Sequence, residues 1–81
     1  MQNRHIILIA NDDEITCTHR QFQILRYIIM GYDSYQIGDC LKISKRTVEA
    51  HTDILKKKFH VHRKSGLIVI MWQSDNIKLF I

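Results

Sequence analysis

The chain has 81 residues, of which 46% are hydrophobic and 25% are charged, and its net charge is +4. A chain of this length has room for one domain with a small core, and we expect residues 1–81 to form a single domain. The longest apolar runs, residues 6–10 and 67–72, are too short to span a bilayer, and the N-terminus lacks the pattern of a signal peptide. We therefore expect a cytoplasmic protein that has no membrane partner.

Positive charge is concentrated between residues 44 and 64, where seven lysines and arginines stand against only Glu49 and Asp53. This segment alone has a larger positive excess than the whole chain. A local basic patch of this kind suits a polyanion such as a nucleic acid. The alternative is a basic helix face that contacts only water, which is a common role for runs of charge.

The N-terminal segment, residues 1–17, has the pattern of a small β-hairpin. Residues 4–10 are mostly apolar and rich in β-branched side chains, and residues 14–17 alternate polar with apolar. Between them, residues 11–13 (Asn-Asp-Asp) favour a turn, since Asn and Asp tolerate left-handed backbone geometry.

Hydrophobic spacing and end signals predict four helices within residues 18–73. The first helix opens with a capping box, Thr18–Gln21, and runs to about Met30. The second helix opens in the same style at Asp33–Gln36. The third helix, residues 44–59, is expected to have one apolar and one polar side. Its apolar stripe consists of Val48, His51, Leu55 and Phe59. We expect His51 on this stripe to be packed and hydrogen-bonded.

The fourth helix starts near residue 63 or 64 and is apolar on nearly all sides. A small protein can hardly bury so many sides in its own core, so this helix is predicted to form a subunit interface. The predicted interface residues are Leu67, Ile68, Ile70, Met71 and Trp72. The alternative is that the chain termini cover the helix. The C-terminal tail, residues 74–81, contains an apolar run at 77–81 that is compatible with a strand beside residues 4–10.

Cysteine and histidine usage gives no sign of a metal or a disulfide. Cys17 and Cys40 lie in contexts typical of core positions, and a reducing compartment disfavours a disulfide between them. The pairs Cys17-x-His19 and His60-x-His62 lack the spacing of a structural zinc site. No catalytic set and no glycine-rich phosphate loop is recognisable, so we predict neither a cofactor nor an enzyme.

Three ordered motifs carry a resemblance to a known family. They read Cys-Thr-His-Arg-Gln-Phe-Gln-Ile-Leu at residues 17–25, Leu-x-Ile-Ser-x-x-Thr-Val-x-x-His at 41–51, and Lys-Lys-Phe-His-Val at 57–61. With these motifs, residues 17–72 resemble the LuxR-type helix-turn-helix family, which includes the DNA-binding domains of bacterial response regulators and quorum-sensing regulators.

The resemblance implies an all-α domain of four helices, with the core at residues 18–73 and the hairpin as an N-terminal extension. It implies that helix 44–59 enters the major groove of double-stranded DNA. It also implies a homodimer on two-fold-related half-sites, formed largely through the fourth helix. The implied function is a sequence-specific transcription regulator, with RNA polymerase or a related regulator as a possible protein partner. Such a chain is a stand-alone regulator or the output domain of a longer one.

Candidate DNA contacts lie at the start of the second helix and along the third helix. The candidate residues are Ser34, Tyr35, Ser44, Lys45, Arg46, Thr47, Glu49, Ala50, Asp53 and Lys57. The hydroxyl groups suit phosphates, and the two cations in the first turn of the third helix suit a phosphate or a guanine edge. Glu49 could accept a hydrogen bond from cytosine, and Ala50 could touch a thymine methyl group. We also expect a phosphate contact from at least one of the lysines at 56–58.

Two acidic residues on the expected groove face depart from the family pattern. Many relatives have lysines where this chain has Glu49 and Asp53. We expect Asp53 to pair with Lys57, four residues later on the helix. The departure leaves open a second hypothesis: a protein-interaction module or antagonist that heterodimerises with a related regulator and binds DNA weakly.

Overall fold

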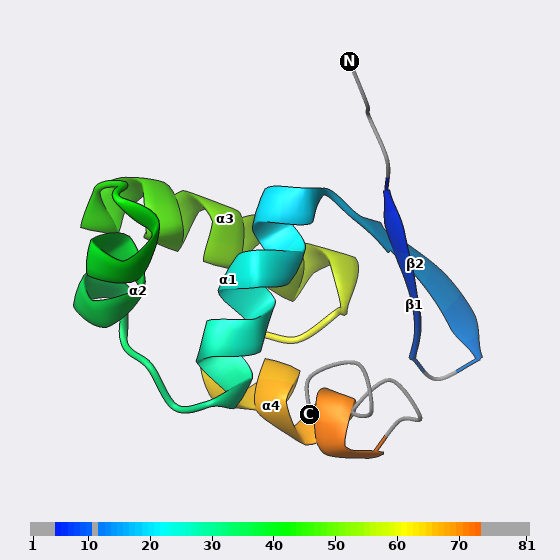
Figure 1. Cartoon of the computed structure of the whole chain (residues 1–81). Coiled ribbons are helices and arrows are strands. Elements are labelled where there is room, and N and C mark those ends of the chain that lie inside the picture. Colours follow the sequence, from blue (N-terminus) through cyan, green and yellow to red (C-terminus); the bar gives the residue numbers. More distant parts are fainter. Residues whose placement is uncertain (1–4, 11, 74–81) are drawn as a thin grey trace.

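In the computed structural model, residues 5–10 and 12–73 are described. They form two strands followed by four helices (Figure 1): β1 (Ile6–Ala10), β2 (Asp13–Cys17), α1 (His19–Ile29), α2 (Ser34–Leu41), α3 (Lys45–Lys58) and α4 (Lys64–Gln73). The predicted fold class, four helices with an N-terminal hairpin, is confirmed. The strand predicted at residues 77–81 lies outside the described residues.

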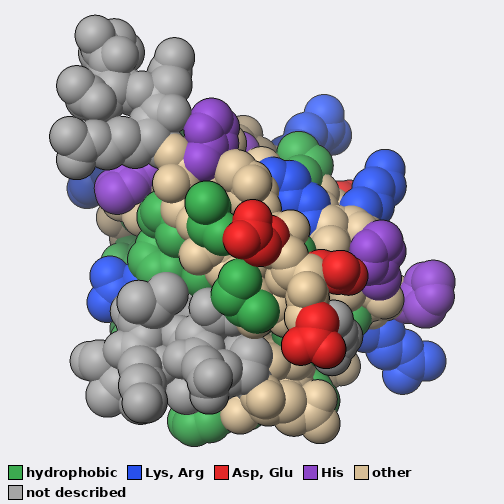
Figure 2. All heavy atoms as spheres, turned by 90° about the vertical axis from the view of Figure 1, so that its right-hand side faces the viewer, with side chains coloured by type: hydrophobic (Ala, Val, Ile, Leu, Met, Phe, Trp, Pro, Cys, Tyr) green, Lys and Arg blue, Asp and Glu red, His purple; other side chains and the backbone are tan. Residues whose placement is uncertain are grey.

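The hairpin closes one end of the helical core. Its strands pair antiparallel, from Ile6 opposite Cys17 to Ala10 opposite Asp13, and the turn passes through Asp12 with φ 66°. One face is buried against the helices through Leu8, Ala10, Ile15 and Cys17. Figure 1 shows the hairpin at the opposite end of the molecule from α2. Figure 2 looks onto its outer face, where acidic and hydrophobic side chains lie close together.

The core lies between α1, α3 and α4, and α2 packs against α3. Its fully buried side chains come from every element and include Leu8, Ile24, Leu25, Ile28, Ile37, Val48, Leu55, Leu67 and Met71. Burial raises the pKa of the Cys17 thiol, although the nearby charge of Lys58 opposes this effect. Cys17 is therefore a neutral, buried thiol, as its sequence context indicated.

Cys40 differs from the expectation of a core position, because it is exposed on α2. The buried face of this helix is centred on Ile37 and Gly38. One turn later that face reaches half-buried Leu41 and turns Cys40 toward solvent. Both cysteines are free.

Two of the helix starts have the predicted capping boxes. The Thr18 hydroxyl accepts from the backbone amide of Gln21 at 3.1 Å, and the side-chain carbonyl oxygen of Gln21 accepts from the backbone amide of Thr18 at 3.0 Å. Asp33 and Gln36 exchange the same pair of bonds at 2.9 Å each. Gly31 follows α1 with φ 91°, the left-handed geometry expected after its last turn.

In α4, only one narrow side faces the core. Leu67 and Met71 are 0% exposed, Ile68 and Ile70 are half-buried, and Trp72 is 59% exposed. No helix in the described ranges is long and apolar enough to cross a membrane.

Candidate nucleic-acid interface

A tight connection sets α3 against α2. A Cβ atom added at Gly38 would lie 2.7 Å from the carbonyl oxygen of Ile43, so only glycine allows this close approach. Lys42 takes φ 61° at the end of α2, and the amide of Ile43 donates to the Gly38 carbonyl at 3.0 Å. This role of Gly38 was not predicted from the sequence, because its contact with Ile43 forms only once α2 and α3 are packed together.

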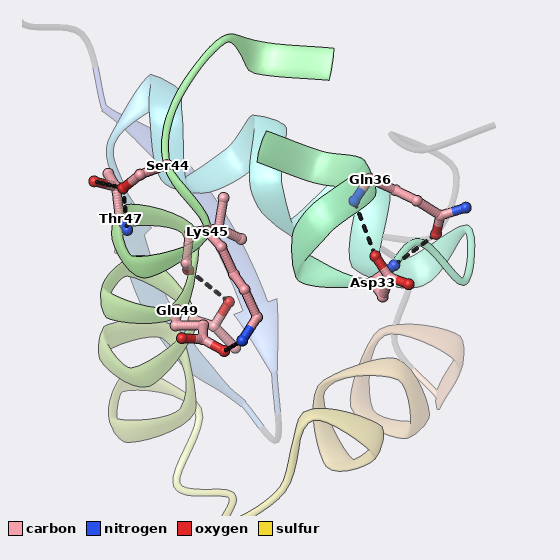
Figure 3. A network of polar contacts seen from close by, with 8 residues as sticks. Asp33, Gln36, Ser44, Lys45, Thr47 and Glu49 are labelled. Atoms are coloured by element: carbon pink, nitrogen blue, oxygen red, sulfur yellow. Dashed lines mark hydrogen bonds and ion pairs between the residues drawn. The ribbon is translucent and has the colours of Figure 1, made fainter. Parts of the chain in front are cut away.

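The first turn of α3 is fixed by its cap. The Ser44 hydroxyl accepts from the amide of Thr47 at 3.0 Å and lies 2.9 Å from the Thr47 hydroxyl (Figure 3). Ser44 therefore caps α3, and both side chains remain exposed. The free amides of this turn point out of the start of the helix, where they can meet an anion.

The two sides of α3 differ as predicted. Val48, Leu55 and Phe59 are buried. The side chains left exposed include Arg46, Glu49, Ala50, Asp53 and Lys57. Thr52 is also buried, which the sequence reading missed. Its hydroxyl donates to the Val48 carbonyl at 2.9 Å, and this bond inside the helix satisfies the polar group.

Lys45 is held between two other candidate residues. Its ammonium lies 3.2 Å from a carboxylate oxygen of Glu49 and 5.0 Å from the centroid of the Tyr35 ring (Figure 3 shows the pair with Glu49). The hydrogen bond to Glu49 and the charge of that carboxylate raise the pKa of Lys45. These contacts connect the exposed Tyr35 of α2 to the first two turns of α3.

The expected pairing of Asp53 with Lys57 is wrong. Asp53 instead lies 3.2 Å from the ammonium of Lys56, three residues along the helix. Lys56 is partly buried at a shallow hollow of about 310 Å³, which Ser34, Glu49, Thr52, Asp53 and Lys64 also line. Lys57 is exposed and has no ion pair within the described ranges.

Lys58 stabilises the fold rather than extending toward solvent. Its ammonium donates to the carbonyl of Thr16 and, at 3.1 Å, to the side-chain carbonyl of Gln21. It thereby ties the end of α3 to the hairpin and to the start of α1. Among the three lysines at 56–58, Lys57 is the one best placed for a phosphate.

His51 differs from expectation in one respect. It is half-buried on the apolar side of α3, as predicted, but its buried Nδ1 atom has no hydrogen-bond partner in the part of the chain that the structure describes. Within the same part, no group of three or more His, Cys, Asp or Glu side chains is placed to hold a metal ion.

A short helix packed tightly before an exposed, partly basic helix defines a helix-turn-helix domain of the kind found in DNA-binding regulators. The chain belongs to the luxR family of bacterial regulatory proteins, since the model of that family matches residues 16–71.

Two kinds of curated relative are similar to the chain. The transcriptional regulatory protein RcsA of Pantoea stewartii subsp. stewartii is 27% identical over 63 residues, which cover 78% of this chain and 30% of RcsA. The Fimbriae Z protein of Escherichia coli K12 is 33% identical over 72 residues, which cover 88% of this chain and 31% of that protein. The chain thus spans about a third of the length of these relatives. No solved structure matched it significantly.

Proposed function

We propose that the protein is a sequence-specific DNA-binding transcription regulator of the bacterial cytoplasm whose α3 enters the major groove. The observation that carries this proposal is the two-sided packing of α3: one side is anchored in the core, and the other presents Arg46, Ala50 and Lys57 to solvent. With 14 residues, α3 is about 21 Å long, and a major groove about 12 Å wide admits such a helix.

The candidate residues divide into two groups by position. Ser34, Tyr35, Ser44, Thr47 and Lys57 lie at helix starts or at the edge of α3 and suit phosphates, which give salt-dependent affinity. Arg46, Glu49, Ala50 and Asp53 lie where base edges would pass and suit base recognition. Lys45 can serve a phosphate if the DNA displaces Glu49 from its ammonium.

We further propose a homodimer formed through α4. Leu67 and Met71 belong to the protomer's own core, so the interface is drawn from Ile68, Ile70 and Trp72, with Val69 added because it is 52% exposed. Two copies related by a two-fold axis would place their α3 helices one helical turn of DNA apart, about 34–36 Å. RNA polymerase or a related regulator would be a partner of this dimer.

A second function, heterodimerisation with a related regulator and only weak DNA binding, is favoured by the ion pairs on α3. Glu49 and Asp53 each neutralise a lysine on the helix that would meet the phosphates. Selection from a pool of random duplexes at two salt concentrations separates the two functions. A palindromic motif whose binding falls steeply with salt supports the DNA reader. Weak binding without enrichment at either salt supports the interaction module.

A further inference from the structure

The exposed side of α3 carries an uncharged stripe beside its cations. Thr47, Ala50 and Ile54 follow one another at intervals of three and four residues, which places them on one face of the helix. Ile54 is 41% exposed, although the fold buries Val48 and Leu55 from the same helix completely. The sequence reading assigned no role to Ile54.

A single exposed isoleucine is common on protein surfaces, so exposure alone does not assign a function to Ile54. The neighbours of Ile54 on the helix surface are more informative. Ala50 lies one turn before it, Lys57 lies three residues after it, and Arg46 lies on the neighbouring row of the same exposed side. An apolar group next to two cations complements a surface that has both phosphates and apolar groups.

We propose that Ile54, together with Ala50, contacts the 5-methyl groups of thymine in the major groove, so that each half-site contains A·T pairs at defined positions. This inference rests on the proposed function of α3. Thymine is the one base that presents an apolar group in the major groove. Ala50 is small enough to let the helix backbone approach the bases closely, and Ile54 reaches further one turn later. The stiff, β-branched side chain of Ile54 loses little rotamer freedom on contact.

The test uses the duplex selected by the wild-type protein and replaces its thymines, one at a time, with deoxyuridine, which pairs identically but lacks the methyl group. Affinity is measured for the wild type, Ile54→Ala and the control Ile7→Ala. Ile7 is an isoleucine of the hairpin that is 56% exposed. Alanine is the strongest helix former, so Ile54→Ala keeps α3 intact, and circular dichroism verifies this.

We expect deoxyuridine at one or two positions of each half-site to weaken wild-type binding about fourfold, the equivalent of one buried methyl group. Ile54→Ala binds thymine and deoxyuridine equally at the position that Ile54 contacts but keeps the wild-type preference at the position that Ala50 contacts, and Ile7→Ala behaves as the wild type. Equal responses of the wild type and Ile54→Ala at every thymine, in a duplex that was truly selected, overturn the inference and leave the proposed function standing. Failure of the wild type to select any duplex overturns the proposed function itself, and this inference with it.

Discussion

The ammonium of Lys45 lies 3.2 Å from a carboxylate oxygen of Glu49, so two residues expected to contact DNA neutralise each other in the free protein. Both side chains are about half exposed, and an ion pair in such contact with water is easily displaced. A phosphate must therefore displace the Glu49 carboxylate before it can contact the ammonium of Lys45. Because the pKa of Lys45 is raised, its ammonium is charged at neutral pH, and its part in the ion pair is lost as the pH rises through that raised pKa.

Removing the Glu49 carboxylate is expected to strengthen binding to random DNA duplexes. In Glu49→Gln, Lys45 is free to reach a phosphate, so affinity for random duplexes rises several-fold and the salt slope steepens by about 0.9 for the added contact. Fluorescence anisotropy across a salt series measures both. Asp39→Asn, which removes an exposed carboxylate from α2, is the control. Equal salt slopes for Glu49→Gln and Asp39→Asn would show that the Glu49 carboxylate does not keep Lys45 from contacting a phosphate.

Arg46 is expected to supply base recognition. Arg46→Ala weakens binding to the selected duplex by about 1–3 kcal/mol and relaxes the preference at one base position. Arg26→Ala, which removes an exposed arginine from the last turn of α1, leaves both unchanged. Repeating the selection with each variant gives the preference directly. A uniform loss across all sequences would assign Arg46 to a phosphate instead.

Substitutions of two neighbouring lysines at the end of α3 are expected to have different effects, one on stability and the other on DNA binding. Lys58→Ala removes bonds to the hairpin and to α1, and lowers the free energy of unfolding by about 1–3 kcal/mol in urea denaturation. Lys57→Ala leaves stability unchanged and weakens DNA binding at low salt. Equal stabilities of the two variants would contradict the structural role of Lys58.

The close approach at Gly38 predicts a second stability effect. Gly38→Ala places a methyl group 2.7 Å from the Ile43 carbonyl oxygen, and moving α3 away costs about 1–3 kcal/mol. Cys40→Ala, at an exposed position of the same helix, is the matched control and stays near wild-type stability. Thermal denaturation of both proteins makes the comparison. A stable Gly38→Ala would mean that the connection between α2 and α3 is loose.

Trp72 reports on the proposed dimer. It is the one tryptophan of the chain and is 59% exposed in the protomer. Its fluorescence is therefore expected to shift to shorter wavelength as protein concentration rises, because dimerisation buries it. Trp72→Ala sediments as a monomer at concentrations where the wild type and Ile7→Ala are dimers. A concentration-independent spectrum together with a monomeric wild type would rule out α4 as the interface.

The features that were predicted correctly from the sequence depend on residues that are close together in the chain. The capping boxes at Thr18 and Asp33 each need only four consecutive residues, and both formed as expected. The apolar period of α3 likewise identified its buried side through Val48 and Leu55. Contacts between elements were harder to predict. Lys58 had no visible partner in the sequence, because its bonds reach the hairpin and α1.

In α4, the sequence lacks the information that orients the helix. Every residue from Leu67 to Trp72 is apolar, so no period distinguishes the buried side from the exposed one. Only packing against α1 and α3 buries Leu67 and Met71 and leaves Trp72 outside. The sequence also predicted Lys57, and not Lys56, as the partner of Asp53. Lys56 lines a hollow that three helices form, and such a contact between elements is not visible in the sequence.

In the proposed function, the exposed side of α3 contacts the major groove of a specific duplex. Amide chemical shifts of the full chain, recorded by NMR during titration with the selected duplex and with a scrambled one, test it most directly. We expect the selected duplex to give the largest shifts in residues 44–57 and at Ser34 and Tyr35, and the scrambled duplex to give smaller ones. Shifts concentrated in the hairpin or in α4, with α3 unchanged, would contradict it.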